Sequence, residues 1–549
     1  TRSSFNLNVS IIMVFTRKIG YLTLFFFIFL FSIFINLLNI NVLVNNPDRY
    51  TGDLVHNSSI RSIDNPWYTT QIRNYIDGNG FTINPEDPIM SVRRTPGYPL
   101  FYGIHYVIFG EENAHKIIPY TQSMIFALSA VAFGATVSLI TNSVAVGYIL
   151  TLLYGTSLFF VGFLFYTITE GIHPSFIVFS LYYAARYFYG KKKFSYKYII
   201  LATFFCAIAT LIRPINGILF IALIFSILAN RKLHFEKRIK STLLSILFFA
   251  LIFSPWVAHN YNKIDEFVLL EKYNQSGAFG GFGAKQESLA KWIRSWGGPE
   301  PSHGAGLHLS ISNDLNTDDK LYTIENFIEK SVPKYAYVGY SKSELFAALV
   351  TYQDCINVRI KKYSSRTSQS DLDSAREIWG PDIQTIDLMK TKWGEPPLKC
   401  ELKVASIFDN FREKIRVGDP LRYYIVSPIL VRGPQYIFHS NTYSMSFLNP
   451  RDKIFNSAQY IVKSFFYIVN VALFVLSIIY LFIKRDRYEK LFFGSFFVIS
   501  FIFLIYFIHV ETRYMLGVYP SMYIMATITL MSFLKYLRSK KINKYHVKQ

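Results

Sequence analysis

The sequence predicts an α-helical polytopic membrane protein with about ten transmembrane helices and a mainly helical extracytoplasmic domain inserted before the last three spans. Composition is the first of three supporting observations: hydrophobic residues make up 51% of the 549 residues and charged residues only 17%. A soluble chain carries roughly 25% charged residues. The second is a series of long apolar runs, and the third is the placement of Lys and Arg. Together they exclude a single water-soluble domain and a disordered chain.

Ten apolar runs are long enough to cross a bilayer as helices, which takes about 20 residues. A further run, residues 98–109, is too short to cross and contains His105, so we expect an interfacial or re-entrant helix there. The ten predicted spans are residues 20–44, 116–140, 143–163, 168–188, 196–212, 214–230, 240–258, 459–483, 489–508 and 514–535.

The positions of the basic residues predict the orientation, because Lys and Arg collect in cytoplasmic connections. With Arg17 and Lys18 in the cytoplasm, the cytoplasmic segments hold 23 Lys and Arg. Their only acidic residues are Glu236, Asp486 and Glu489, so these segments account for most of the formal net charge of +21. The basic excess is therefore a topology signal, and no nucleic-acid partner is expected.

These spans divide the chain into three parts. Residues 1–258 form an N-terminal membrane module with a catalytic first outer loop at 45–115, residues 259–458 an extracytoplasmic domain, and residues 459–549 a C-terminal membrane module with a basic cytoplasmic tail. We expect an integral protein of the cell inner or plasma membrane, or of the endoplasmic reticulum membrane in a eukaryote. Its active site would be extracytoplasmic or lumenal.

The segment 259–458 is long enough to bury its own core. It begins with a glycine-rich stretch at 277–283. Cys355 and Cys400 both fall in it, and an oxidising compartment allows a disulfide between them without requiring one. Helical patterns occur at about 284–296, 318–331, 341–362, 371–379 and 402–416.

Charged residues gather at the predicted outer membrane edge, where ionisable groups usually have a function or a partner. Each has a structural alternative. Asp64 can cap the helix that begins near Pro66, and Arg93 and Arg94 can be interfacial residues. The pairs Glu170 with Arg213 and Glu511 with Arg513 can be structural ion pairs. Their common location on one face favours a shared site.

Several short motifs occur in a fixed order around these residues. They are Asp64-x3-Tyr68, Gly78-x-Gly80-Phe81, Arg94-Thr-Pro-Gly-Tyr-Pro, Phe109-Gly110, Thr169-Glu170, Leu211-Ile-Arg213-Pro214, Pro255-Trp256-x3-Asn260 and Glu511-x-Arg513-Tyr514-x5-Pro520. This order resembles the GT-C superfamily of membrane glycosyltransferases, in particular bacterial relatives of dolichyl-phosphate-mannose protein mannosyltransferases and the aminoarabinose lipid A transferases. The resemblance covers roughly residues 20–260 and 459–535.

The resemblance implies a glycosyltransferase that moves a hexosyl or pentosyl group from a polyprenyl-phosphate donor to a protein, lipid or polysaccharide acceptor. Asp64 would act as the base for the acceptor hydroxyl in an inverting displacement. Arginine suits the phosphate because its planar fork binds two oxygens. No cofactor is required, and a divalent metal is possible but not indicated. The donor phosphate would contact Arg94, Arg213 and Arg513, with supporting or acceptor-side roles for Tyr68, Arg93, Glu170, His259, Asn260, Glu511 and Tyr514.

The sequence also departs from these relatives. Asn65 follows Asp64 where relatives often have a second acidic residue, and His259 stands where they usually have Arg. The Trp-Trp-Asp motif of oligosaccharyltransferases is absent, which argues against transfer of a whole glycan to Asn. The rival hypotheses are a polysaccharide polymerase or ligase, a secondary transporter, and a receptor. Transporter sites usually lie near the bilayer midplane, whereas here the charges lie at one edge.

Overall fold

The computed structural model describes residues 2–45, 53–55, 59–61, 64–85, 88–190, 194–272, 284–298, 317–363, 397–442, 444–445, 448, 457–507 and 511–546. These residues are mainly helical. The strands described are β1 (Asp53–Val55) and β2 (Ser59–Arg61), which pair antiparallel with Leu54 opposite Ile60. The predicted helix at 371–379 and the glycine-rich stretch at 277–283 lie outside the described residues.

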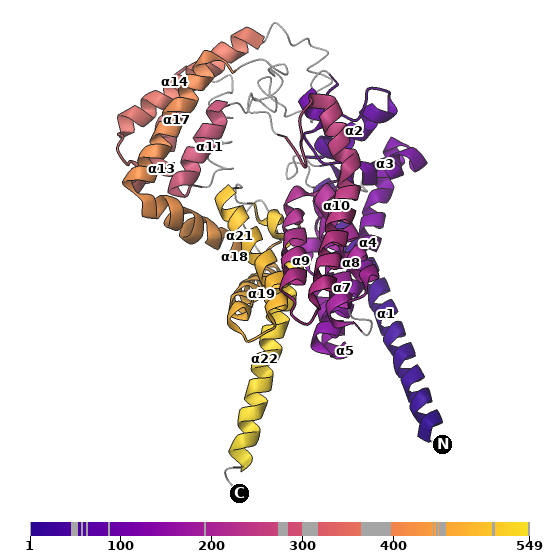
Figure 1. Ribbon diagram of the computed structural model, residues 1–549. Helices are drawn as coiled ribbons and strands as arrows, with labels where there is room; N and C mark the ends of the chain where they lie inside the picture. Colours follow the sequence, from indigo (N-terminus) through magenta and orange to yellow (C-terminus); the bar gives the residue numbers. More distant parts are fainter. Residues whose placement is uncertain are drawn as a thin grey trace.

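The N-terminal half forms a bundle of helices beneath the two short helices α2 and α3 (Figure 1). The short helix expected at 98–109 is present as α3 and has 13 residues. The elements of this half are α1 (Arg2–Val44), α2 (Pro66–Ile76), η2 (Pro88–Ser91), α3 (Gly97–Phe109), α4 (Glu111–Thr141), α5 (Val144–Gly155), α6 (Leu158–Val161), η3 (Thr169–Gly171), α7 (His173–Tyr189), α8 (Tyr196–Ile212), η4 (Pro214–Asn216), α9 (Gly217–Ala229) and α10 (Phe235–Ile264).

The following segment builds a separate helical body with its own apolar core (Figure 1). Trp292, Leu345, Tyr352 and Phe408 are buried in that core. Cys355 and Cys400 form a disulfide. The helices are α11 (Ala284–Trp296), α13 (Thr317–Ser331), η6 (Lys334–Ala336), α14 (Lys342–Tyr363) and α17 (Lys399–Gly418).

The chain then returns to the membrane bundle through a π-helix and a short α-helix, η8 and α18. Buried apolar residues of the C-terminal helices, such as Phe497 and Met522, share one core with those of the N-terminal half, such as Phe126 and Leu181. The elements are η8 (Arg422–Arg432), α18 (Gly433–Ile437), α19 (Ser457–Phe482), α20 (Arg487–Glu489), η10 (Lys490–Gly494), α21 (Ser495–Phe507), η11 (Thr512–Met515) and α22 (Tyr519–His546).

Five helical segments of the described chain are long and apolar enough to cross a membrane: residues 19–44, 111–141, 235–264, 457–482 and 487–506. Shorter apolar helices occupy 144–155, 196–212 and 214–229. These helices support an integral membrane protein. The count of ten spans stays a prediction, although each of the ten predicted ranges contains helix. Both chain termini lie at the end of the molecule opposite to α2, α3 and the separate helical body (Figure 1).

Candidate functional site

Arg513 is the centre of a charged cluster built from four segments of the chain. Its Nη1 lies 2.8 Å from Oδ2 of Asp64, in the turn before α2. Its Nε forms an ion pair with Glu511 and lies 3.5 Å from Oε1 of Glu170. The side chain of Asp64 therefore does not cap α2, since it faces Arg513 instead. Asn65 occupies the N-cap position, and its side chain caps no backbone amide there.

The cluster continues inward from Arg513 to Arg213. Nη1 of Arg213 lies 2.6 Å from Oε1 of Glu170 and also donates to the Thr169 hydroxyl at 3.3 Å. That hydroxyl in turn donates to Oε2 of Glu170 at 2.8 Å, so both carboxylate oxygens of Glu170 are engaged. The ring of Tyr514 covers the Arg213 guanidinium at 4.5 Å. These contacts define the inner, closed end of the cluster.

The two inner residues of the cluster are less exposed than the two outer ones. The side chain of Glu170 is 3% exposed and that of Arg213 12%. Arg513 is 22% exposed and Asp64 35%. Asp64 is thus the most exposed carboxylate of the cluster, ahead of Glu511 at 29%.

Backbone pairing and one buried amide bring Asp64 beside Glu170. Ile60 of β2 pairs with the segment before η3, where its N–H donates to the Phe165 carbonyl at 2.8 Å. Asn65, next to Asp64, donates through Nδ2 to the Thr167 carbonyl at 3.2 Å. Thr167 precedes Glu170 by only three residues. These hydrogen bonds therefore hold the segment that carries Asp64 next to the segment that carries Glu170.

Gly97 explains how the start of α3 comes close to Arg213. A Cβ at position 97 would lie 2.5 Å from the backbone nitrogen of Ile212, so only glycine permits this approach of α3 to the end of α8. Arg213 follows Ile212 directly, and Arg94 precedes Gly97 by three residues. The Arg-Thr-Pro-Gly motif therefore serves a packing requirement as well as carrying a charged group.

Arg93 and Arg94 form a second basic group around aromatic rings. Both guanidinium groups lie 5.7 Å from the Trp67 ring, and that of Arg94 is also 5.6 Å from the Tyr68 ring. Such contacts are cation–π interactions. Arg94 is 24% exposed and lies 3.8 Å from the Glu271 carboxylate, which also accepts from the Thr95 N–H at 3.4 Å.

The charges of the cluster nearly balance. If all five groups are ionised, three carboxylates and two guanidinium groups leave one formal negative charge. Burial alone lowers the pKa of Arg213, but the facing Glu170 carboxylate raises it above its usual value. Burial also opposes the charge of Arg513, yet Glu170, Asp64 and Glu511 raise its pKa well above the usual range. Both arginines therefore stay charged at any physiological pH.

Tyr68 lies between the two basic groups. Its ring packs edge-on against Tyr98 at 5.7 Å. Burial raises the pKa of the Tyr68 phenol above its usual value, while Arg94 opposes that shift. The phenol is therefore neutral at physiological pH and is not a candidate base.

Two predicted site residues, His259 and Asn260, have contacts of a structural kind. Nε2 of His259 lies 3.3 Å from the Ser91 carbonyl, and the imidazole ring stacks on Trp256 at 5.2 Å. Nδ2 of Asn260 donates to the Val268 carbonyl at 2.7 Å. No contact described in the structure joins either residue to the Arg513 cluster, so their predicted roles stay predictions.

The sequence did not predict three features of the site. They are the position of Glu271 beside Arg94, the hydrogen bonds of the Thr169 hydroxyl with Glu170 and Arg213, and the burial of His173. His173 is 1% exposed, and its Nδ1 lies 3.4 Å from the Asn216 amide nitrogen. Thr169 was part of a motif but had no assigned contact. Glu271 precedes the glycine-rich stretch without any local pattern, so nothing in the sequence marked it.

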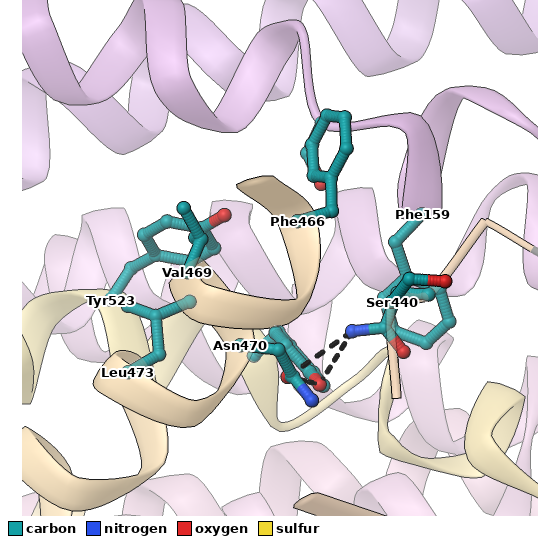
Figure 2. Close-up of a pocket in the computed structure, with 10 residues that line it drawn as sticks. Phe159, Ser440, Phe466, Val469, Asn470, Leu473 and Tyr523 are labelled. Atoms are coloured by element: carbon teal, nitrogen blue, oxygen red, sulfur yellow. Dashed lines mark hydrogen bonds between the residues drawn. The ribbon is translucent and has the colours of Figure 1, made fainter. Parts of the chain in front are cut away.

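Figure 2 shows a pocket formed by described residues of the chain. It is lined by Phe159, Asn441, Phe466, Asn470 and Tyr519, among others, and by none of the predicted site residues. The described residues also include no group of three His, Cys, Asp or Glu side chains placed to bind a metal ion.

Similarity to known proteins is found among solved structures. No family model matches the chain, and no curated protein matches it. A solved structure is similar to it: the archaeal oligosaccharyltransferase AglB from Archaeoglobus fulgidus, in complex with an inhibitory peptide and a dolichol-phosphate. The identity is 12%, the TM-score is 0.41, and the match covers 96% of this chain and 52% of that one. The chain thus spans about half the length of that protein.

Proposed function

We propose that the protein is an integral-membrane glycosyltransferase that moves a sugar from a polyprenyl-phosphate donor to an acceptor on the extracytoplasmic face. The observation that carries this proposal is the cluster of Asp64, Arg513, Glu170 and Arg213, graded from a closed inner end to an exposed carboxylate. Buried charges are costly in a membrane protein and usually mark function. The order of the motifs around these residues supports the same reaction class.

In the proposed reaction, Oδ1 of Asp64 accepts the proton of the acceptor hydroxyl while the hydroxyl oxygen attacks the anomeric carbon. The bond from that carbon to the phosphate oxygen breaks, and the polyprenyl phosphate leaves with the electron pair. Arg513 holds Oδ2 of Asp64 and so orients the carboxylate. A positioned base of this kind contributes about 10²- to 10⁴-fold to the rate.

The phosphate would first meet Arg94, which is 24% exposed and is held by the Trp67 and Tyr68 rings. Arg513 would orient Asp64 and Arg213 would hold Glu170, because the three carboxylates of the cluster already balance both guanidinium charges. Glu170 acts as a positioning residue for both arginines, since its two carboxylate oxygens are already engaged. Glu511 would do the same for Arg513. The acceptor can be a protein, a lipid or a polysaccharide.

The test is a transfer assay with purified protein in lipid nanodiscs. The donors are polyprenyl-phosphate sugars extracted from the source membranes, and the acceptors are the glycan, lipid and protein fractions of the same membranes. We expect mass spectrometry to detect release of free polyprenyl phosphate together with a sugar mass added to one acceptor fraction. If neither product is detected and the protein instead carries a solute across the membrane of proteoliposomes, the transferase proposal is wrong and the protein is a transporter.

A further inference from the structure

The chain between the separate helical body and the membrane bundle forms a distinct segment, residues 421–438, which we call the arm. It contains the π-helix η8 and the short helix α18. A π-helix of 11 residues is unusual, because π-geometry normally occurs as single turns and often at functional sites. The arm is therefore a candidate for a role that an ordinary connecting helix would not need.

The first end of the arm is held by the separate helical body. The Asp419 carboxylate accepts from the backbone N–H and from Nε of Arg422, each at 3.0 Å. The Arg422 guanidinium lies 3.9 Å from the Tyr335 ring. Ser427 donates to the Ser295 carbonyl at 2.9 Å.

The second end of the arm is held by the membrane bundle. Arg432 is 2% exposed and donates to the carbonyl of Ile505, near the end of α21. Helix α18 also packs against η11, which contains Arg513 of the charged cluster. Nδ2 of Asn470, in α19, donates to the Ile437 carbonyl at 2.5 Å. This end of the arm thus lies at the level of the candidate site.

A polar network in the pocket of Figure 2 secures the chain just beyond the arm. Asn441 adopts a left-handed backbone conformation with φ of 57°. Its Nδ2 donates to the Tyr519 hydroxyl at 2.7 Å and to Oδ1 of Asn470 at 3.2 Å. The pocket is therefore part of the attachment between the arm and helices α19 and α22.

Between these two attachments, every exposed side chain of the arm is apolar or aromatic. The polar residues Ser427 and Arg432 are buried, and Arg422 and Gln435 are only partly exposed. Spacings of four and five residues place most of the exposed positions on one side of the helix. The exposed fractions are 61% for Leu421, 46% for Tyr424, 45% for Ile425, 43% for Ile429, 62% for Leu430 and 53% for Phe438.

Helix α19 contacts α18 and also exposes apolar side chains. It is apolar and long enough to cross a membrane, and it exposes Tyr460, Ile461, Phe465 and Ile468 by 53% to 70%. A helix that faced water on that side would carry charged residues there. Large apolar patches rimmed by polar residues are typical of protein or membrane contacts. Here the patch adjoins a candidate membrane span.

We propose that the arm lies in the outer leaflet of the bilayer, with its apolar stripe against lipid chains. Tyr424 and Arg422, at its first end, have the side chains favoured at the membrane–water interface. The Arg432 side chain is buried inside the protein and donates to the Ile505 carbonyl. This hydrogen bond offsets part of the free-energy cost of a charged group at membrane depth. The arm does not cross the bilayer, because α18 at its second end packs against η11 at the level of the charged cluster. This inference does not depend on the proposed transferase activity.

The arm so placed would fix the separate helical body to the bilayer beside the candidate site. The arm would then connect α17, which contacts η8, to η11, which contacts α18 and contains Arg513. An acceptor held by the helical body would approach Asp64 along the membrane surface.

The test measures lipid exposure with spin labels in nanodiscs. Single cysteines are introduced at Ile425 and Leu430 in a Cys206→Ser background, which leaves the Cys355–Cys400 disulfide intact. Control labels are placed at Ile468 of α19, as a lipid-facing reference, and at Lys342 of α14, which is 59% exposed, as a water-facing reference. Accessibility to oxygen is compared with accessibility to a water-soluble nickel chelate.

We expect the labels at Ile425 and Leu430 to match the Ile468 label, with a higher oxygen-to-nickel ratio than the Lys342 label. A ratio at both arm positions equal to that of Lys342 would place the arm in water and overturn the proposal. Poor access to both reagents, combined with cross-linking between chains through these cysteines, would assign the patch to a second copy and would also overturn it.

Discussion

Two regions of the molecule each bury an ion pair. They differ in whether further charged residues connect the pair to an exposed side chain. In the separate helical body, Lys285 and Glu401 lie 2.8 Å apart and are 1% and 0% exposed. Glu401 also accepts from the Leu398 N–H at 3.1 Å at the start of α17. In the membrane bundle, Glu170 and Arg213 are similarly close but continue through Arg513 to Asp64, which is 35% exposed.

The difference separates a structural pair from a candidate reactive site. A closed pair such as Lys285 with Glu401 has no surface for a ligand, so its role is limited to the stability and specificity of packing. A graded cluster has fully engaged charges at its inner end and a more exposed carboxylate at its outer end. The inner groups, Glu170 and Arg213, can then hold Arg513 in place, and Arg513 in turn orients the Asp64 carboxylate.

Asp64→Asn tests the difference between the two regions most directly. We expect the rate of sugar transfer to fall about 10²- to 10⁴-fold because the base is lost. The asparagine oxygen still accepts from Arg513, so thermal stability should change little. Initial rates and melting temperatures are measured on the same preparation. Asp77→Asn, at the exposed end of α2, is the matched control and should keep the wild-type rate. A wild-type rate in Asp64→Asn would make Asp64 a purely structural partner of Arg513.

The second prediction concerns the closed pair. Lys285→Met leaves Glu401 buried without its cation, which should cost about 3–5 kcal/mol of the stability of the separate helical body. Hydrogen exchange and limited proteolysis of α11 and α17 measure the loss. The double variant Lys285→Met with Glu401→Leu removes both charges and should recover most of the protection. A single variant as well protected as the wild type would show that the pair is unimportant even for packing.

Arg94 provides a third, smaller contrast, because it is the basic residue of the site that we expect to contact the donor directly. Arg94→Gln should weaken binding of the polyprenyl-phosphate donor by about 1.5–3 kcal/mol, the contribution of a hydrogen bond to a charged group. Arg94→Lys keeps the charge but loses the planar fork, so it should recover only part of the affinity. Donor affinity is measured by native mass spectrometry. Arg416→Gln in the separate helical body is the control. If it weakens donor binding as much as Arg94→Gln does, Arg94 does not contact the donor phosphate specifically.

The smallest effect is expected for Tyr68→Phe. The ring remains between Arg94 and Tyr98, and only a neutral hydroxyl worth about 0.5–1.5 kcal/mol is lost. Burial raises the pKa of Tyr68, so folding favours the neutral phenol. That contribution to stability is complete below the unfolded pKa of about 10 and decreases only above it. The pH–rate profiles of variant and wild type should therefore coincide between pH 6 and 9. A shift of the alkaline limb would show that the phenol titrates during the reaction.

Much of the helical organisation was predictable because it depends on local pattern. The stretches predicted at 284–296 and 318–331 correspond to α11 (Ala284–Trp296) and α13 (Thr317–Ser331). The short run at 98–109 folds as α3 (Gly97–Phe109). Apolar periodicity and helix-ending residues act over a few turns, so sequence alone is enough to locate such elements.

The candidate site was predictable only as a set of residues on one side of the membrane. The amino-acid sequence by itself determined which segments are apolar enough for the bilayer and which charged residues stand at their ends. Only the tertiary structure decided that Arg513 meets Asp64 across 449 positions of sequence, that Glu271 lies beside Arg94, and that Arg432 is buried in the arm. The physical reason is that burial depends on each segment's own composition, whereas the partner of a charged side chain depends on how distant helices pack together.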